Sequence, residues 1–157
     1  MRVGSGYDVH PFAEGRELVL GGVAFEGETG LAGHSDGDVL THAVIDAVLG
    51  AAALGDIGSH FPSSDERLLG ADSIDLLKQV TKLIAAAGYA IVNVDATVIA
   101  EAPKIAPHVA EMRKRLSLAL GLAVDCVSVK ATTTDRLGAI GRGEGIAVQA
   151  IALVREA

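Results

Sequence analysis

The sequence predicts an α+β fold: a single-domain sandwich in which a mixed sheet of about five strands carries three helices packed on one face. Three observations favour this fold. The 157 residues suit one compact domain. Segments with apolar residues at helical spacing occur between segments rich in β-branched residues. The latter alternate polar and apolar residues, as expected for a sheet that helices cover on one face only.

Five strands are expected, bounded by turn-forming residues. They comprise residues 2–10, 17–25, 89–100, 124–132 and 145–155. A turn is expected at residues 11–15, which contain Pro11 and Gly15, and a loop at residues 27–33.

Three helices are expected on one face of this sheet. The first follows Ser35, whose hydroxyl can accept a hydrogen bond from the amide of residue 38, and it ends near Gly55. The second covers residues 73–87 and the third residues 107–120. The polar loop at residues 56–72 is long for a compact domain, and such loops are usually functional or mobile.

Composition narrows the classes of function. Lys and Arg total 13 against 20 Asp and Glu, a net charge of -7, which argues against a nucleic-acid partner but not against a small phosphorylated ligand. No uncharged apolar run reaches the roughly 18 to 20 residues of a membrane helix, so no membrane partner is expected. The first ten residues lack the features of a signal peptide, which predicts a cytoplasmic protein. The single cysteine, Cys126, is interpreted as a small core residue, and the 50% hydrophobic content suggests that identical partners cover some of the surface.

Three residues form a candidate metal site. Asp8 and His10 lie two positions apart in the first expected strand, so their side chains leave the same face. His42 in the first expected helix can complete a set of two imidazoles and one carboxylate, which favours zinc with an open fourth position. Asp38 and Asp46 flank His42 by four residues on either side and are candidates for orienting its free ring nitrogen. On spacing alone, a chance arrangement explains the pattern at least as well.

Other polar residues stand where they could bind phosphate. His34 precedes the first expected helix, whose amides and dipole attract anions. The threonines at residues 132–134 and the following Asp135 suit phosphate oxygens and a hard cation such as magnesium. A polar loop and a threonine-rich turn are the structural alternatives for these segments. The glycine-rich residues 141–145 favour a tight turn, and Lys104 alone is consistent with a solvated lysine.

Six segments stand in a distinctive order. They are Gly-Tyr-Asp-Val-His (6–10), His-Ser-Asp-Gly-Asp-Val (34–39) with His42, Leu-Gly-Asp-Ile-Gly (54–58) with Phe61 and Pro62, Ala-Pro-Lys (102–104), Lys-Ala-Thr-Thr-Thr (130–134) and Gly-Arg-Gly-Glu-Gly-Ile-Ala (141–147). Together they resemble the 2-C-methyl-D-erythritol 2,4-cyclodiphosphate synthases over essentially the whole chain. The resemblance implies that residues 1–157 form a single catalytic domain.

The resemblance implies an activity and an assembly. The enzyme would convert 4-diphosphocytidyl-2-C-methyl-D-erythritol 2-phosphate to the cyclic diphosphate and CMP, in non-mevalonate isoprenoid precursor biosynthesis. It would be a homotrimer with active sites between subunits. The attacking group would be the substrate's own 2-phosphate, which needs no strong general base because its second pKa is about 6.

The resemblance also implies roles for individual residues. The aspartate and two histidines described above match zinc ligands, and Asp135 matches the carboxylate of a second divalent cation, magnesium or manganese. His34 and Thr133 match catalytic residues that stabilise the transition state. Positions around the methylerythritol phosphate are matched by Ser35, Asp56, Ile57, Gly58, Phe61, Pro62, Ser63 and Asp65. Positions around the cytidine and diphosphate are matched by Ala100, Pro103, Lys104, Ile105, Ala106 and Thr132, with Arg142 at a further binding position.

Three residues depart from the family pattern. Asp135 stands where glutamate is usual, Ser63 replaces a frequent aspartate, and Ala139 replaces a phenylalanine in the wall of a cavity on the trimer axis. Two other functions use the same features: a zinc-dependent phosphohydrolase with a metal-bound water, and a non-catalytic trimer that binds a cytidine nucleotide.

Overall fold

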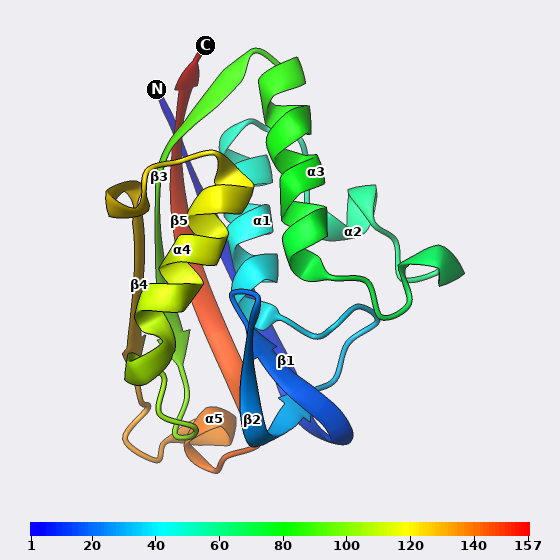
Figure 1. Ribbon diagram of the computed structural model, residues 1–157, viewed down its shortest axis with the longest axis vertical. Helices are drawn as coiled ribbons and strands as arrows, with labels where there is room; N and C mark the ends of the chain where they lie inside the picture. The colour runs from blue at the N-terminus through cyan, green and yellow to red at the C-terminus, as the bar shows by residue number, and fades with distance from the viewer.

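A five-stranded sheet forms one layer of the molecule. Its strands, in the computed structural model of residues 1–157, are β1 (Arg2–Leu20), β2 (Val23–Leu31), β3 (Tyr89–Ile99), β4 (Val127–Thr132) and β5 (Gly145–Glu156). They lie in the order β2-β1-β5-β3-β4 (Figure 1). β3 and β4 are parallel and the other neighbouring pairs are antiparallel, so the sheet is mixed. The predicted α+β fold is confirmed.

Helices form the second layer. The three long helices are α1 (Val39–Ala51), α3 (Ser73–Ala86) and α4 (Val109–Leu120). α1 contacts β1 and β5, α4 contacts β4, and α3 packs between α1 and α4 and against β3, all on one face of the sheet (Figure 1). The remaining helical segments are α2 (Ile57–His60), α5 (Gly138–Gly141) and three 3-10 turns, Glu66–Leu68, Ala106–His108 and Val124–Cys126. No helix is both long and apolar enough to cross a membrane.

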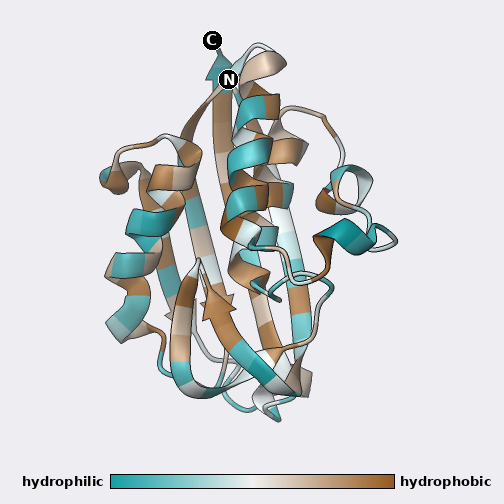
Figure 2. Ribbon diagram, turned by 45° about the vertical axis from the view of Figure 1, so that its right-hand side comes forward, coloured by the Kyte–Doolittle hydropathy of each residue, from teal (hydrophilic) through white to brown (hydrophobic).

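Burial of apolar side chains between the two layers holds the fold together. Hydrophobic and hydrophilic bands alternate along the long helices in Figure 2, while several strands behind them carry long hydrophobic stretches. One cluster of 33 buried apolar residues joins helices and sheet, with Leu40, Leu77 and Met112 fully covered.

The first strand differs from the sequence-based expectation. β1 runs without interruption from Arg2 to Leu20, and the expected turn at residues 11–15 is wrong. Residues 2–11 pair with β5, the later part of β1 pairs with β2, and irregularities in register between Phe12 and Leu18 mark the change of partner. The hairpin turn lies instead at Gly21 and Gly22, whose φ angles of 56° and 73° suit a two-residue turn. The expected strand at residues 17–25 is therefore wrong, and so is most of the expected loop at residues 27–33, because β2 continues to Leu31.

Smaller differences concern element ends. α1 is capped by Asp38, which accepts from the amide of Thr41 at 2.9 Å, and not by Ser35. α1 ends at Ala51, the expected loop at residues 56–72 contains α2 and a 3-10 turn, and α5 was not expected. Cys126 lies half-buried in a 3-10 turn before β4.

Close packing of α1 on β1 sets the position of the candidate site. Gly4 and Gly6 face α1, and a Cβ at either would overlap the backbone of Ala47 or Ala43. Two glycines therefore let the helix that carries His42 lie directly on the strand that carries Asp8.

The opposite face of the sheet is uncovered in the single chain. Side chains that alternate with the helix-facing glycines of β1 point to this face, and Val3, Tyr7 and Val9 are 67%, 61% and 48% exposed. Ile151 of β5, which pairs with Ser5, adds another exposed apolar side chain to the same face. Exposed apolar side chains grouped on one sheet face, here beside polar ones such as Gln149 and Asp95, are typical of a protein interaction surface.

Candidate metal centre and phosphate-binding cavities

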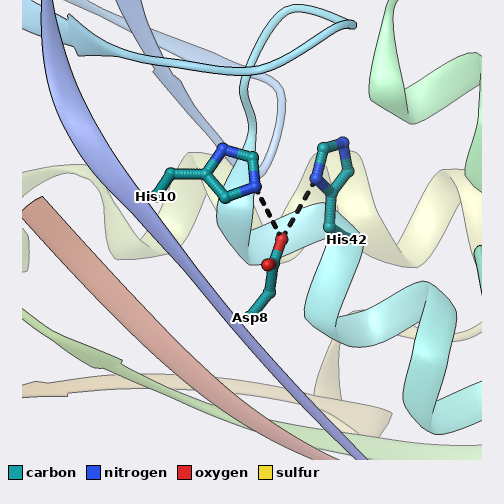
Figure 3. A group of neighbouring side chains, drawn as sticks. All are labelled: Asp8, His10 and His42. Atoms are coloured by element: carbon teal, nitrogen blue, oxygen red, sulfur yellow. Dashed lines mark hydrogen bonds and ion pairs between the residues drawn. The ribbon is translucent and has the colours of Figure 1, made fainter. Parts of the chain in front are cut away.

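The predicted metal ligands meet at one point. Figure 3 shows Asp8 and His10 from β1 and His42 from α1 directed toward each other. Oδ2 of Asp8 lies 2.9 Å from Nε2 of His10 and 3.2 Å from Nδ1 of His42. The three ligand atoms all lie within 4.8 Å of one another.

This donor set fits a divalent metal ion. Ligands held about 2.0 to 2.1 Å from a tetrahedral zinc ion are about 3.3 Å apart, close to the two distances at Asp8. The other ring nitrogen of His42, Nε2, lies 3.0 Å from both Ser35 Oγ and Ser73 Oγ. Hydrogen bonding of that nitrogen to a hydroxyl leaves Nδ1 free to face a metal ion, an arrangement common around metal-bound histidines.

The electrostatics of Asp8 and His42 also favour a cation. Burial raises the pKa of Asp8, but hydrogen bonds from His10 and His42 outweigh it and hold the pKa below its usual range. Burial lowers the pKa of His42, while Asp8 raises it and prevails. Without a metal, a proton between Asp8 and His42 therefore stabilises the pair, and a metal ion would replace that proton.

The two aspartates proposed as partners of His42 make other contacts. Asp38, which is fully buried, accepts hydrogen bonds from the amides of Gly21 and Gly22 and from the amide and hydroxyl of Thr41. Asp46 accepts from the amide of Ile57 at 2.7 Å and so supports the start of α2. The expectation that one of these two aspartates orients His42 is wrong, because hydroxyl groups occupy that place.

A cavity of about 290 Å³ opens beside the metal ligands. Its predicted lining residues, besides the three ligands, are His34, Ser35, Ile57, Gly58, Phe61 and Ser63. Pro62, Asp56 and Asp65 do not line it: Asp56 caps α2, and the carboxylate of Asp65 pairs with Arg67 at 2.7 Å. Asp65 still contributes through its carbonyl oxygen, which lies 3.0 Å from Nε2 of His34.

A second cavity, of about 230 Å³, lies at the end of β3 and β4. The predicted residues that line it are Ala100, Pro103, Lys104, Ile105, Ala106, Thr132 and Thr133. Asp135 and Arg142 lie outside it, the first on an exposed turn and the second paired with Glu144 at 2.6 Å.

Within one chain the two cavities are separate. They share no lining residue. Asp8 is in register with Val148 of β5, Val148 with Val98 of β3, and Val98 with Ala131 of β4. Three strand spacings of about 4.8 Å therefore put about 14 Å between Asp8 and Ala131. The predicted residues thus gather into two groups that the single chain does not bring together.

Three residues that support these cavities were missed from the sequence. Arg16 donates to the carbonyl oxygens of Gly33 and Ser35, on either side of His34. Ser73 contacts His42, and Glu101 binds the turn after β4. Of the three, only Ser73 lies in a pattern that the sequence shows, the start of a helix. Capping of that helix already explains a serine there, so the pattern does not point to His42.

Comparisons with known proteins place this architecture in a family. A model of the YgbB family matches residues 1–155. Proteins named 2-C-methyl-D-erythritol 2,4-cyclodiphosphate synthase from Methylobacillus flagellatus and Pseudomonas aeruginosa are 56% and 59% identical to this chain. The alignments cover 99% and 98% of this chain, and 98% of each relative.

Solved structures with similar folds carry related names. The bifunctional IspDF of Campylobacter jejuni is 42% identical with a TM-score of 0.96 over 99% of this chain, which spans 42% of that longer protein. A structure described as IspF of Plasmodium falciparum in complex with CDP is 35% identical with a TM-score of 0.85, covering 99% of this chain and 96% of that one. Because the family model and the full-length relatives cover nearly every residue, the chain belongs to the YgbB family.

Proposed function

We propose that this chain is a 2-C-methyl-D-erythritol 2,4-cyclodiphosphate synthase, a lyase of isoprenoid precursor biosynthesis. It converts 4-diphosphocytidyl-2-C-methyl-D-erythritol 2-phosphate to the cyclic diphosphate and CMP. The observation that carries the proposal is the convergence of Asp8, His10 and His42 beside a cavity that His34 and Ser35 also line. Relatives of this name, 56% to 59% identical over nearly the whole chain, support it.

The reaction is a displacement at phosphorus. An oxygen of the substrate's 2-phosphate forms a bond to the β-phosphorus, and the bond from that phosphorus to the oxygen bridging the α-phosphate breaks, so CMP leaves with the bridging oxygen. The barrier lies in bringing two anions together, and fixed donors and cations lower it.

We assign zinc to Asp8, His10 and His42, and magnesium or manganese to Asp135. When bound, these ions supply positive charge that neutralises the phosphates. The chain's own residues fix the geometry. His34 is held through Asp65 and Ser35 through Arg16, which places an imidazole and a hydroxyl at the first cavity.

The two cavities divide the substrate between them in this proposal. The first, with Ser35, Ile57, Gly58, Phe61 and Ser63, takes the methylerythritol phosphate, and Asp56, Pro62 and Asp65 shape its rim. The second, with Lys104, Thr132 and Thr133, takes the cytidine and diphosphate, and Arg142 lies beyond it. Thr133 stabilises the transition state with His34. The CDP named in the Plasmodium falciparum structure supports a nucleotide in this fold.

We propose that a neighbouring copy completes the site in a homotrimer. Two observations support this: the two cavities are separate within one chain, and the sheet face with Val3, Tyr7, Val9 and Ile151 is exposed. The cytoplasmic location stays a prediction, which cell fractionation would test.

Phosphorus NMR with the cytidyl substrate tests the activity. The expected products are CMP and a cyclic diphosphate. Release of inorganic phosphate would indicate a zinc-dependent phosphohydrolase, and binding of CDP without turnover would indicate a nucleotide-binding trimer. Either result would overturn the proposed reaction.

Mixing two inactive variants tests the shared site. Of the two cavities of the proposed site, His42→Ala alters only the first and Lys104→Ala only the second. If each site draws one cavity from each of two neighbours, random reassociation of an equal mixture should restore roughly one site in four, all of them in mixed trimers. Mixtures without activity, in which mass spectrometry shows that subunits have exchanged, would place the whole site within one chain.

A further inference from the structure

The exposed turn after β4 is hydrogen-bonded to a distant part of the chain by one side chain, that of Glu101. Residues 133–136 make hydrogen bonds to a distant part of the chain only through Glu101, which follows β3. The amides of Thr134 and Arg136 donate to Oε1 of Glu101 at 3.0 and 3.1 Å. The hydroxyl of Thr134 lies 3.1 Å from the same oxygen but closer, at 2.7 Å, to the carbonyl of Leu137. The two amides are therefore the main ties.

The backbone between these ties is in an unfavourable conformation. Asp135 and Arg136 have φ angles of 52° and 65°, in the left-handed region that residues with a Cβ rarely occupy. The amides of Thr134 and Arg136, on either side of Asp135, point to one side and form a concave site for an anion. The Glu101 carboxylate occupies that site and compensates for the strained backbone.

The clamped amides lie on either side of Asp135. The hydroxyl of Thr133 lies 3.2 Å from the amide of Asp135 and 3.4 Å from its carboxylate. These contacts fix the two residues relative to each other. Thr133 and Glu101 both line the second cavity. Fixing the backbone at Thr134 and Arg136 thus fixes where Thr133 and Asp135 stand relative to that cavity.

We infer that Glu101 is a positioning residue that holds Thr133 and Asp135 in place for the diphosphate and its second cation. This inference rests on the proposed function for its catalytic consequence, whereas the clamp itself is a property of the chain alone. Glu101 touches neither substrate nor cation in this role, and it acts through the turn.

The geometry distinguishes two substitutions. All the donors point to one oxygen, Oε1, and Oε2 accepts no hydrogen bond. Glutamine can present its carbonyl oxygen to the same amides, so Glu101→Gln should retain the turn. Glu101→Ala removes the acceptor and should release it. Glu111→Ala, which removes an exposed carboxylate on α4 paired with Arg115, is a matched control.

The experiment compares the three variants with the wild type in two measurements. Hydrogen–deuterium exchange of the peptide spanning residues 133–137 should be slow in the wild type, Glu101→Gln and Glu111→Ala and fast in Glu101→Ala. In CMP release, Glu101→Ala should need about tenfold more magnesium for half-maximal rate, with turnover lower by about 10- to 100-fold, because small displacements of reacting groups have effects of this size. Zinc content should not change.

The outcomes separate the two hypotheses. A wild-type enzyme that releases no CMP overturns the proposed function, and the exchange data still decide whether Glu101 clamps the turn. An active wild type with unchanged exchange and magnesium dependence in Glu101→Ala overturns the inference. Equal loss of activity in Glu101→Gln and Glu101→Ala, with the turn still protected in the former, also overturns it, because the charge and not the position would then matter.

Discussion

Replacing Asp38 by alanine should destabilise the fold strongly, because this buried carboxylate joins two elements. It caps α1 at Thr41 and also accepts from the amides of Gly21 and Gly22 in the β1–β2 hairpin. Losing a helix cap costs about 1 kcal/mol, and each buried amide left without an acceptor costs about 1 to 2 kcal/mol more. Burial raises the pKa of Asp38, so its removal recovers part of a desolvation cost. A net loss of about 3 kcal/mol is expected, a large share of a typical stability of about 5 to 15 kcal/mol.

The assay is urea unfolding at one fixed protomer concentration, because association would otherwise shift the apparent stability. The matched control is Asp72→Ala, which removes the exposed cap of α3 and a single hydrogen bond to the amide of Ile74 at 2.8 Å. That variant should lose only about 1 kcal/mol. Equal losses in Asp38→Ala and Asp72→Ala would refute the reasoning, since they would show that the hairpin amides contribute nothing.

Further substitutions test the metal ligands and one ion pair. His42→Ala should abolish zinc binding and turnover together, and full turnover in a variant shown by elemental analysis to be free of metal would contradict the ligand assignment. In Asp135→Asn, added magnesium should raise activity less than in the wild type, while zinc content should stay intact. A magnesium titration with metal analysis would reveal both. A hydrogen bond from Lys130 lowers the pKa of Asp95 below 3.8, so this pair stabilises the fold above that pH and its contribution is lost as the pH falls through the lower folded-state value. Asp95→Asn should therefore flatten the acid side of the stability profile by less than about 1 kcal/mol, and an unchanged profile in urea unfolding would disprove the assignment.

The helices and most strands could be predicted because their signals are local. α3 and α4 have apolar residues at helical spacing, and β3 alternates between polar and apolar residues from Asn93 to Val98, so side-chain periodicity defines most of these elements. The error at residues 11–15 has a nonlocal cause. Proline and glycine look like a turn there, but β1 continues because it exchanges one partner strand for another at that point.

The candidate site was predictable only in part, for a related reason. Residue types show which side chains can bind a metal or a phosphate, and the order of six segments indicates the family. Neither the residue types nor the order of the segments shows which side chains hold the ligands in place. Ser73 lies 31 residues from the histidine that it contacts, and Glu101 lies 33 and 35 residues from its amide donors, so no spacing rule connects them.

The two halves of the proposed site, the metal ligands and the turn with Thr133, differ in how rigidly the fold holds them. The metal ligands lie on a strand and a helix locked together by buried contacts at Gly4, Gly6 and Asp38, so their geometry should change little when substrate binds. The turn with Thr133 is exposed, and its hydrogen bonds to a distant part of the chain all go to one carboxylate. If the halves come from different subunits, their relative position depends on the subunit interface and on this turn. Adjustment to the substrate should therefore occur in the half with Thr133, while the half with Asp8, His10 and His42 acts as the fixed reference.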